Sequence, residues 1–129
     1  MILYIFRTYT PQSNIFMNTL YGIKNCDTVK KARLWLDKNQ VSYRFHDYRS
    51  DGLTTELLKY FAGSLGWDTL LNRSSTSWRQ LSKEQQADLN EEKAMQLMME
   101  FPTLIKRPIL DTGKNLVIGF KSGNYQNDL

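Results

Sequence analysis

The sequence predicts an α/β fold built on a mixed sheet of about four strands. A strand–helix–strand pattern opens the main part of the chain at residues 19–48, and two short apolar runs flank a turn near its end, at 109–110 and 116–120. The first pattern predicts two parallel strands with a right-handed crossover, and the second predicts an antiparallel hairpin. Together they predict helices packed on a sheet as an α/β sandwich.

The opening pattern divides into a strand at 19–23, a helix that starts after Asn25 and ends at Asn39, and a strand at 41–48. The second strand alternates apolar and polar residues, as a half-buried strand does. The apolar positions of the helix recur at three- and four-residue spacing: Val29, Ala32, Trp35 and Leu36.

Residues 54–101 are predicted to form a helical insertion between the two halves of the sheet. Thr54 is the expected cap of a helix that runs to about Leu65, and Asn90 is the expected cap of a later one. Between these helices, residues 67–83 have a weak pattern that predicts short helices or loops.

One α/β domain is expected over residues 17–129, preceded by an N-terminal extension at 1–16. The extension has two interpretations: upstream sequence translated in error before Met17, or a real but dispensable arm. Its longest apolar run is too short to cross a bilayer, and it lacks the pattern of a signal peptide. No membrane segment is therefore expected.

Composition and charge exclude several classes of protein. The chain has 41% hydrophobic and 23% charged residues, and its net charge of +4 comes from Lys and Arg scattered among acids. This distribution is not typical of a nucleic-acid-binding protein. The single cysteine rules out an internal disulfide and favours a reducing cytoplasm. We expect a cytoplasmic monomer without a metal.

Cys26 is the candidate nucleophile. A lone cysteine is more often a small buried apolar residue, but this one lies where a strand gives way to a helix. The N–H groups and the positive end of the helix dipole there stabilise a thiolate. Lys30 would add positive charge one turn along, or is simply a solvated lysine, whereas Asp27 opposes the thiolate unless it caps the helix. Asn25, in the same turn, is a candidate binding residue.

A redox cycle at Cys26 would need a thiol from outside the chain. Val29 stands where a Cys-x-x-Cys motif has its second cysteine. The expected partner is glutathione, with a glutaredoxin-like thiol donor or the thiol of another protein as alternatives. His46 is the only histidine and is expected at the surface.

Arg107 and Pro108 form the second feature of interest. A proline at the start of a strand could be cis, which would turn Arg107 toward neighbouring loops as a donor to an oxyanion or a glutathione carboxylate. A trans proline on an edge strand, with a solvated arginine, fits the pattern equally well.

Five blocks of the chain carry a family resemblance: residues 19–32, 43–48, 66–72, 78–81 and 105–108. In this order they resemble the arsenate reductase (ArsC)/Spx family, and within it the YffB-like subgroup of small bacterial proteins. The resemblance covers about residues 17–125.

The resemblance implies a thioredoxin-like (glutaredoxin-like) three-layer sandwich with a nucleophilic cysteine facing an arginine before a cis-proline. These positions match Cys26, Arg107 and Pro108. In arsenate reductases, further arginines hold the oxyanion and glutathione completes the cycle. The second arginine position falls at Asn72, beside Arg73, and the third has no counterpart.

One matched arginine of three makes arsenate reduction the weaker alternative and a glutathione-dependent thiol oxidoreductase the main expectation. Spx-type relatives are regulators that bind RNA polymerase, and many switch through a Cys-x-x-Cys disulfide that Val29 removes here. A regulatory protein-binding module without a redox switch is the second expectation. The tail at 120–129 is expected to stop where relatives form a final helix.

Overall fold

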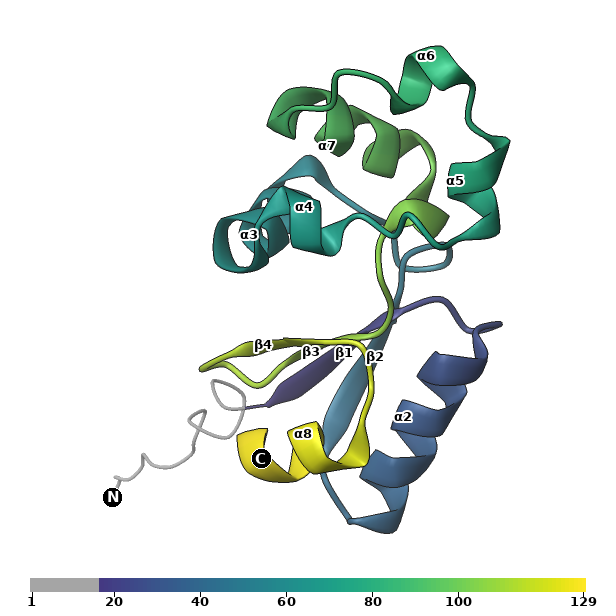
Figure 1. The fold of residues 1–129 in the computed structure, drawn as a ribbon. Coiled ribbons are helices and arrows are strands. Elements are labelled where there is room, and N and C mark those ends of the chain that lie inside the picture. Colours follow the sequence, from purple (N-terminus) through teal and green to yellow (C-terminus); the bar gives the residue numbers. More distant parts are fainter. Residues whose placement is uncertain (1–16) are drawn as a thin grey trace.

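The computed structural model describes residues 17–129, which fold into three layers with a four-stranded sheet in the middle (Figure 1). The strand order is β2-β1-β3-β4. The strands are β1 (Asn18–Gly22), β2 (Tyr43–Asp47), β3 (Ile109–Asp111) and β4 (Leu116–Ile118). The extension predicted at 1–16 lies outside the described residues.

The sheet is mixed, as the sequence predicts. β1 and β2 run parallel, and Leu20 pairs with Phe45. β3 is antiparallel to both β1 and β4, so that Leu110 pairs with Leu20 on one side and Val117 on the other. The predicted parallel unit and terminal hairpin are both confirmed, and β1 joins them at the centre of the sheet.

Helices α2 (Asp27–Lys38) and α8 (Ser122–Asp128) cover one face of the sheet (Figure 1). The predicted apolar stripe of α2 supplies three of the side chains buried there, and Trp35 packs at their edge. The fully buried members of this core are Leu20, Ala32, Leu36, Leu110 and Tyr125.

The expectation that the chain stops short of a final helix is wrong. α8 forms within the residues predicted as a tail, and its Tyr125 is fully buried. The Tyr125 ring packs edge-on against Trp35 at 5.6 Å and Phe120 at 4.9 Å between centroids. The helix has only seven residues. Isolated helices of this length are unstable in water, so this packing must stabilise it.

The helical insertion covers the other face of the sheet (Figure 1). The Thr54 hydroxyl accepts from Leu57 N at 3.1 Å and the Asn90 side chain accepts from Lys93 N at 2.8 Å, so both predicted caps are confirmed. Its elements are α3 (Thr55–Leu65), α4 (Trp67–Leu70), α5 (Thr76–Gln80), α6 (Lys83–Gln86), α7 (Glu91–Glu100) and the 3₁₀ helix η2 (Pro102–Leu104).

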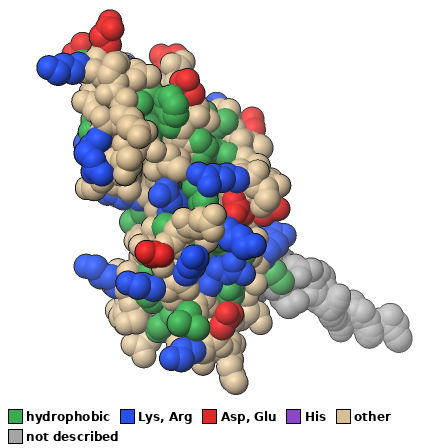
Figure 2. All heavy atoms as spheres, turned by 90° about the vertical axis from the view of Figure 1, so that its right-hand side faces the viewer, with side chains coloured by type: hydrophobic (Ala, Val, Ile, Leu, Met, Phe, Trp, Pro, Cys, Tyr) green, Lys and Arg blue, Asp and Glu red, His purple; other side chains and the backbone are tan. Residues whose placement is uncertain are grey.

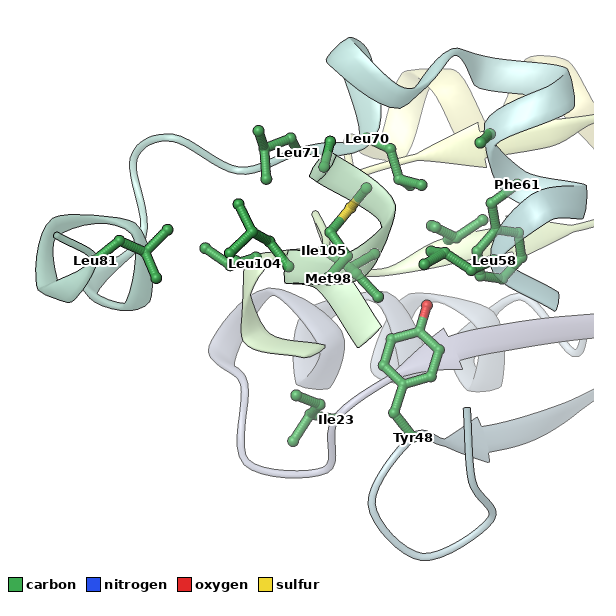
Figure 3. Close-up of a cluster of buried hydrophobic side chains, with 14 residues drawn as sticks. Ile23, Tyr48, Leu58, Phe61, Leu70, Leu71, Leu81, Met98, Leu104 and Ile105 are labelled. Atoms are coloured by element: carbon green, nitrogen blue, oxygen red, sulfur yellow. The ribbon is translucent and has the colours of Figure 1, made fainter. Parts of the chain in front are cut away.

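A second apolar core lies between the insertion and the sheet, and Figure 3 shows part of it. Phe61 of α3 and Met98 of α7 are fully buried in it, and Ile23 and Tyr48 enter it from the ends of β1 and β2. This core joins the insertion to the end of the sheet at which the loop carrying Cys26 begins.

Candidate functional site

Cys26 is the N-cap residue of α2. Its backbone is extended, with φ −137° and ψ 122°, and its carbonyl accepts the first helical hydrogen bond from Lys30 N at 2.9 Å. The side chain is half-buried and makes no capping hydrogen bond. The thiol therefore sits at the helix end where backbone N–H groups lack intrahelical partners, while it stays accessible to a reaction partner.

Asp47, at the end of β2, holds the loop that leads to Cys26. One carboxylate oxygen accepts from Lys24 N at 3.0 Å and the other accepts from Arg49 N at 2.8 Å. Burial disfavours the charged carboxylate, but backbone N–H donors, those of Arg49 and Lys24 foremost, outweigh it and lower the pKa of Asp47. This role of Asp47 was not predicted from the sequence. An aspartate at the end of a strand, shortly before the turn at Asp51 and Gly52, was the available signal.

Gly22 brings β1 against the first turn of α2. A Cβ atom at this position would lie 2.8 Å from Cγ2 of Val29, which is closer than a side-chain contact allows. Val29 is fully buried at this contact. Val29, which stands where a Cys-x-x-Cys motif has its second cysteine, therefore packs α2 onto the sheet one turn after Cys26.

Arg107 and Pro108 lie beside the strand that leads to Cys26. The Arg107–Pro108 peptide bond is cis. Tyr21 pairs with Ile109, so that the same register, continued by one residue, sets Pro108 against Gly22. In Figure 1 the chain enters β3 next to the end of β1 from which the Cys26 loop departs.

The Arg107 side chain is half-buried and is partly held by its own segment. Its Nη1 donates to the carbonyl oxygens of Thr103 at 2.8 Å and Ile105 at 3.0 Å. Its Nε is buried and has no hydrogen-bond partner among residues 17–129. The solvated arginine that the sequence left open as an alternative is not what the structure contains.

The two residues at the second arginine position take different partners. Asn72 is joined to the segment before Arg107, because its N–H donates to the Leu104 carbonyl at 2.7 Å. Its side-chain oxygen accepts from Ser74 N at 3.0 Å and so forms a turn. Arg73 instead pairs with Asp68 at 2.7 Å.

The remaining predicted residues lie on the surface around Cys26. Asn25 and Lys30 are exposed, as are Lys24 and Lys31. Figure 2, viewed from the side of α2, shows basic side chains gathered across the middle of this face with acidic ones among them. These charges would attract an anionic partner to this side of the molecule.

His46 is half-buried instead of lying freely at the surface. Its ring packs on Tyr21 at 5.0 Å between centroids, and its Nε2 hydrogen-bonds with the Gly52 carbonyl at 2.7 Å. These contacts indicate that His46 has a structural role.

Residues 17–129 contain no group of three or more metal-ligating side chains positioned to hold a metal ion. Within the same part of the chain, no helix is long and apolar enough to cross a membrane.

Relatives of this chain include proteins with and without an assigned function. An uncharacterized protein of Haemophilus influenzae is 46% identical over 110 residues, covering 85% of this chain and 96% of the relative. The global transcriptional regulator Spx 1 of Bacillus cereus is 28% identical over 88% of this chain and 87% of the regulator. The regulatory protein MgsR of Bacillus subtilis is 31% identical, over 81% and 84%.

Solved structures support the same relationship. The YffB protein is 48% identical with a TM-score of 0.82, and the match covers 86% of this chain and 97% of that one. An arsenate reductase (ArsC) related protein from Brucella melitensis is 41% identical with a TM-score of 0.72, over 86% and 92%. The thioredoxin-like three-layer fold is thereby confirmed. Because the ArsC family profile also matches residues 21–127, this chain belongs to the ArsC family.

Proposed function

We propose that this protein is a glutathione-dependent thiol oxidoreductase whose nucleophile is the Cys26 thiolate. The observation that carries the proposal is the position of a half-buried, accessible sulfur at the N-terminus of α2. Backbone N–H groups at such a helix end favour the thiolate, which is the reactive form. The ArsC membership agrees with this kind of chemistry but does not by itself name the substrate.

The reaction we propose is a thiol–disulfide exchange in two steps. The Cys26 thiolate attacks the glutathione sulfur of a mixed disulfide, a bond forms between Cys26 and glutathione, and the substrate leaves as a thiolate that takes a proton from water. The thiolate of a second glutathione then attacks this adduct, which releases Cys26 and yields glutathione disulfide. The net exchange turns one mixed disulfide and one glutathione into one substrate thiol and one glutathione disulfide.

Arg107 would orient the anionic partner in this reaction. Because two backbone carbonyls hold its Nη1, the guanidinium is positioned before the partner arrives. Pro108 fixes the chain next to it, and the exposed Asn25 and Lys30 would contact the partner near the sulfur. Asn72 would act on the neighbouring segment, whereas Arg73 must first release Asp68 before it can bind an anion.

Arsenate reduction is the weaker alternative for the same thiol. A multiply charged oxyanion needs several fixed cationic donors. Arg107 is the one matched arginine, and Arg73 is occupied by Asp68. We expect no arsenate-dependent turnover in an assay coupled through glutathione and glutaredoxin.

Incubation of the protein with glutathione disulfide, followed by mass spectrometry of the intact chain, tests the proposal. We expect one glutathione adduct, which must lie on Cys26 because the chain has no other cysteine. Cys26→Ser should take up none, and added glutathione should reverse the adduct. If Cys26 forms the adduct no faster than an unfolded control of the same chain, the proposal fails.

A regulatory binding module is the second candidate, and the regulators Spx 1 and MgsR among the relatives favour it. In that case a surface would bind a protein such as RNA polymerase, and Cys26 would not be needed. Complementation of a deletion strain with Cys26→Ser separates the two functions. Full complementation supports the binding module, and loss of complementation supports the oxidoreductase. We place either activity in the cytoplasm, with the protein as a monomer.

A further inference from the structure

Tyr48 has a buried hydroxyl that the proposed reaction has not yet used. The residue is 4% exposed, and its hydroxyl has no hydrogen-bond partner within the described chain from Met17 onward. In Figure 3 the ring extends from the end of β2 into the apolar core, with its oxygen directed toward the side chains of the insertion. A buried hydroxyl without a partner is unfavourable, so its retention calls for an explanation.

Strand pairing brings Tyr48 and Arg107 to the same end of β1, on its two sides. Gly22 pairs with Asp47 and Tyr21 with Ile109, so that Tyr48 follows directly after the last pair on one side of β1 and Arg107 lies two residues before Ile109 on the other side. The Tyr48 N–H donates to the Gly22 carbonyl at 2.9 Å, which continues the parallel pairing to this point. Ile23 and Tyr48 enter the same core, and so does Ile105, whose carbonyl accepts a hydrogen bond from Arg107.

The charge of Arg107 acts on the Tyr48 hydroxyl. Burial raises the pKa of Tyr48, and the Arg107 guanidinium opposes that rise. The hydroxyl is thus a neutral phenol near a fixed cation. Arg107 in turn has a buried Nε without a partner in residues 17–129, so each group has the hydrogen-bonding atom that the other lacks.

We propose that Tyr48 is a positioning residue for Arg107: its hydroxyl oxygen accepts a hydrogen bond from Nε when Arg107 engages the anionic group of the partner. The carbonyls of Thr103 and Ile105 hold one corner of the guanidinium, and Tyr48 holds the Nε edge. The remaining donors are then directed at a carboxylate or another oxyanion near Cys26. This inference rests on the role of Arg107 in the proposed function.

The test compares Tyr48→Phe with Tyr125→Phe. Both variants remove a buried hydroxyl that has no partner among the described residues, but Tyr125 lies in the core on the opposite face of the sheet. Thermal unfolding is measured first. We expect both variants to be as stable as the parent or more so, because neither loses a hydrogen bond.

Alkylation of Cys26 by iodoacetate and by neutral iodoacetamide then reports on Arg107 without any glutathione. We expect Tyr48→Phe to lower the iodoacetate-to-iodoacetamide rate ratio about tenfold or more, the size expected for one hydrogen bond to a charged group. Tyr125→Phe should keep the parent ratio. Arg107→Gln should lower the ratio at least as much, and adding Tyr48→Phe to it should lower the ratio no further.

The inference is overturned if Tyr48→Phe keeps the parent ratio, or if its effect is undiminished in the Arg107→Gln background. It is also overturned if Arg107→Gln leaves the ratio unchanged, because Arg107 then does not serve the thiol. Absence of a glutathione adduct would reject the proposed function alone, since the alkylation ratio does not depend on glutathione.

Discussion

Asp47 connects the end of β2 to the loop of the candidate nucleophile through backbone N–H groups. Burial works against its ionisation and the donated hydrogen bonds outweigh it, so its pKa lies below the usual value. A carboxyl with a lowered pKa stabilises the folded state above its unfolded pKa of about 3.9, and that contribution disappears as the pH falls through the folded value.

Asp47→Asn should therefore lower the free energy of unfolding by about 1 to 3 kcal/mol near neutral pH, because a buried charged acceptor of backbone hydrogen bonds is lost. The difference from the parent should be constant down to about pH 5 and should shrink below about pH 4. Urea unfolding at a series of pH values measures it. Asp37→Asn, at an exposed position of α2, is the control and should behave like the parent. A difference that grows in acid would contradict this account.

At the scale of the element, α2 combines an accessible sulfur at its N-cap residue with a fully buried Val29 one turn later. Cα atoms three residues apart on a helix are about 5 Å apart, within the range of about 4.4 to 6.8 Å that a disulfide bridges. The geometry of α2 is thus suited to a Cys-x-x-Cys motif that the sequence does not contain.

Val29→Cys should convert the single-thiol site into a dithiol one. With a mild oxidant we expect an intramolecular disulfide to Cys26, and the glutathione adduct at Cys26 should become short-lived because the new thiol displaces glutathione. Mass spectrometry with thiol counting measures both. Lys31→Cys adds a thiol on the exposed side of α2 and should form no such bond. Two free thiols in oxidised Val29→Cys would show that the first turn holds the side chains apart.

The C-terminal helix α8 depends on the burial of one aromatic side chain. Tyr125→Ala should lower the free energy of unfolding by about 3 to 5 kcal/mol, as expected for loss of a large ring from a core. Asn124→Ala, at the exposed neighbouring position, should change it by less than about 0.5 kcal/mol. Equal effects of the two substitutions would mean that α8 contributes little to the core around Trp35.

At the scale of the whole molecule, two contacts far apart in sequence tie the insertion to the sheet. Leu71 pairs with Ile105 in an isolated antiparallel bridge, next to the segment that carries Arg107. The Tyr60 hydroxyl of α3 donates to the Asp111 carboxylate at 3.0 Å, which joins the insertion to the end of β3. The second core fills the space between them. The insertion thus fixes the segment that carries Arg107, and β1 fixes the start of the loop that carries Cys26.

Local sequence patterns were sufficient to predict much of this structure. The element order, the caps at Thr54 and Asn90, and the position of Cys26 at the start of α2 follow from periodicity and from hydrogen bonds between near neighbours. The sequence also shows directly that Val29 stands where a Cys-x-x-Cys motif would have its second cysteine. Such features depend on a few consecutive residues, so the chain specifies them before it folds.

Only the tertiary structure decided the features whose partners lie far along the chain. Asp47 meets Lys24 across two strands, Tyr125 packs on Trp35, and Tyr48 and Arg107 come to the same end of β1 from its two sides. Burial supplies the physical reason in each case. A polar group or a short helix gains or loses its partners only when distant segments exclude water around it, and no local pattern records that event.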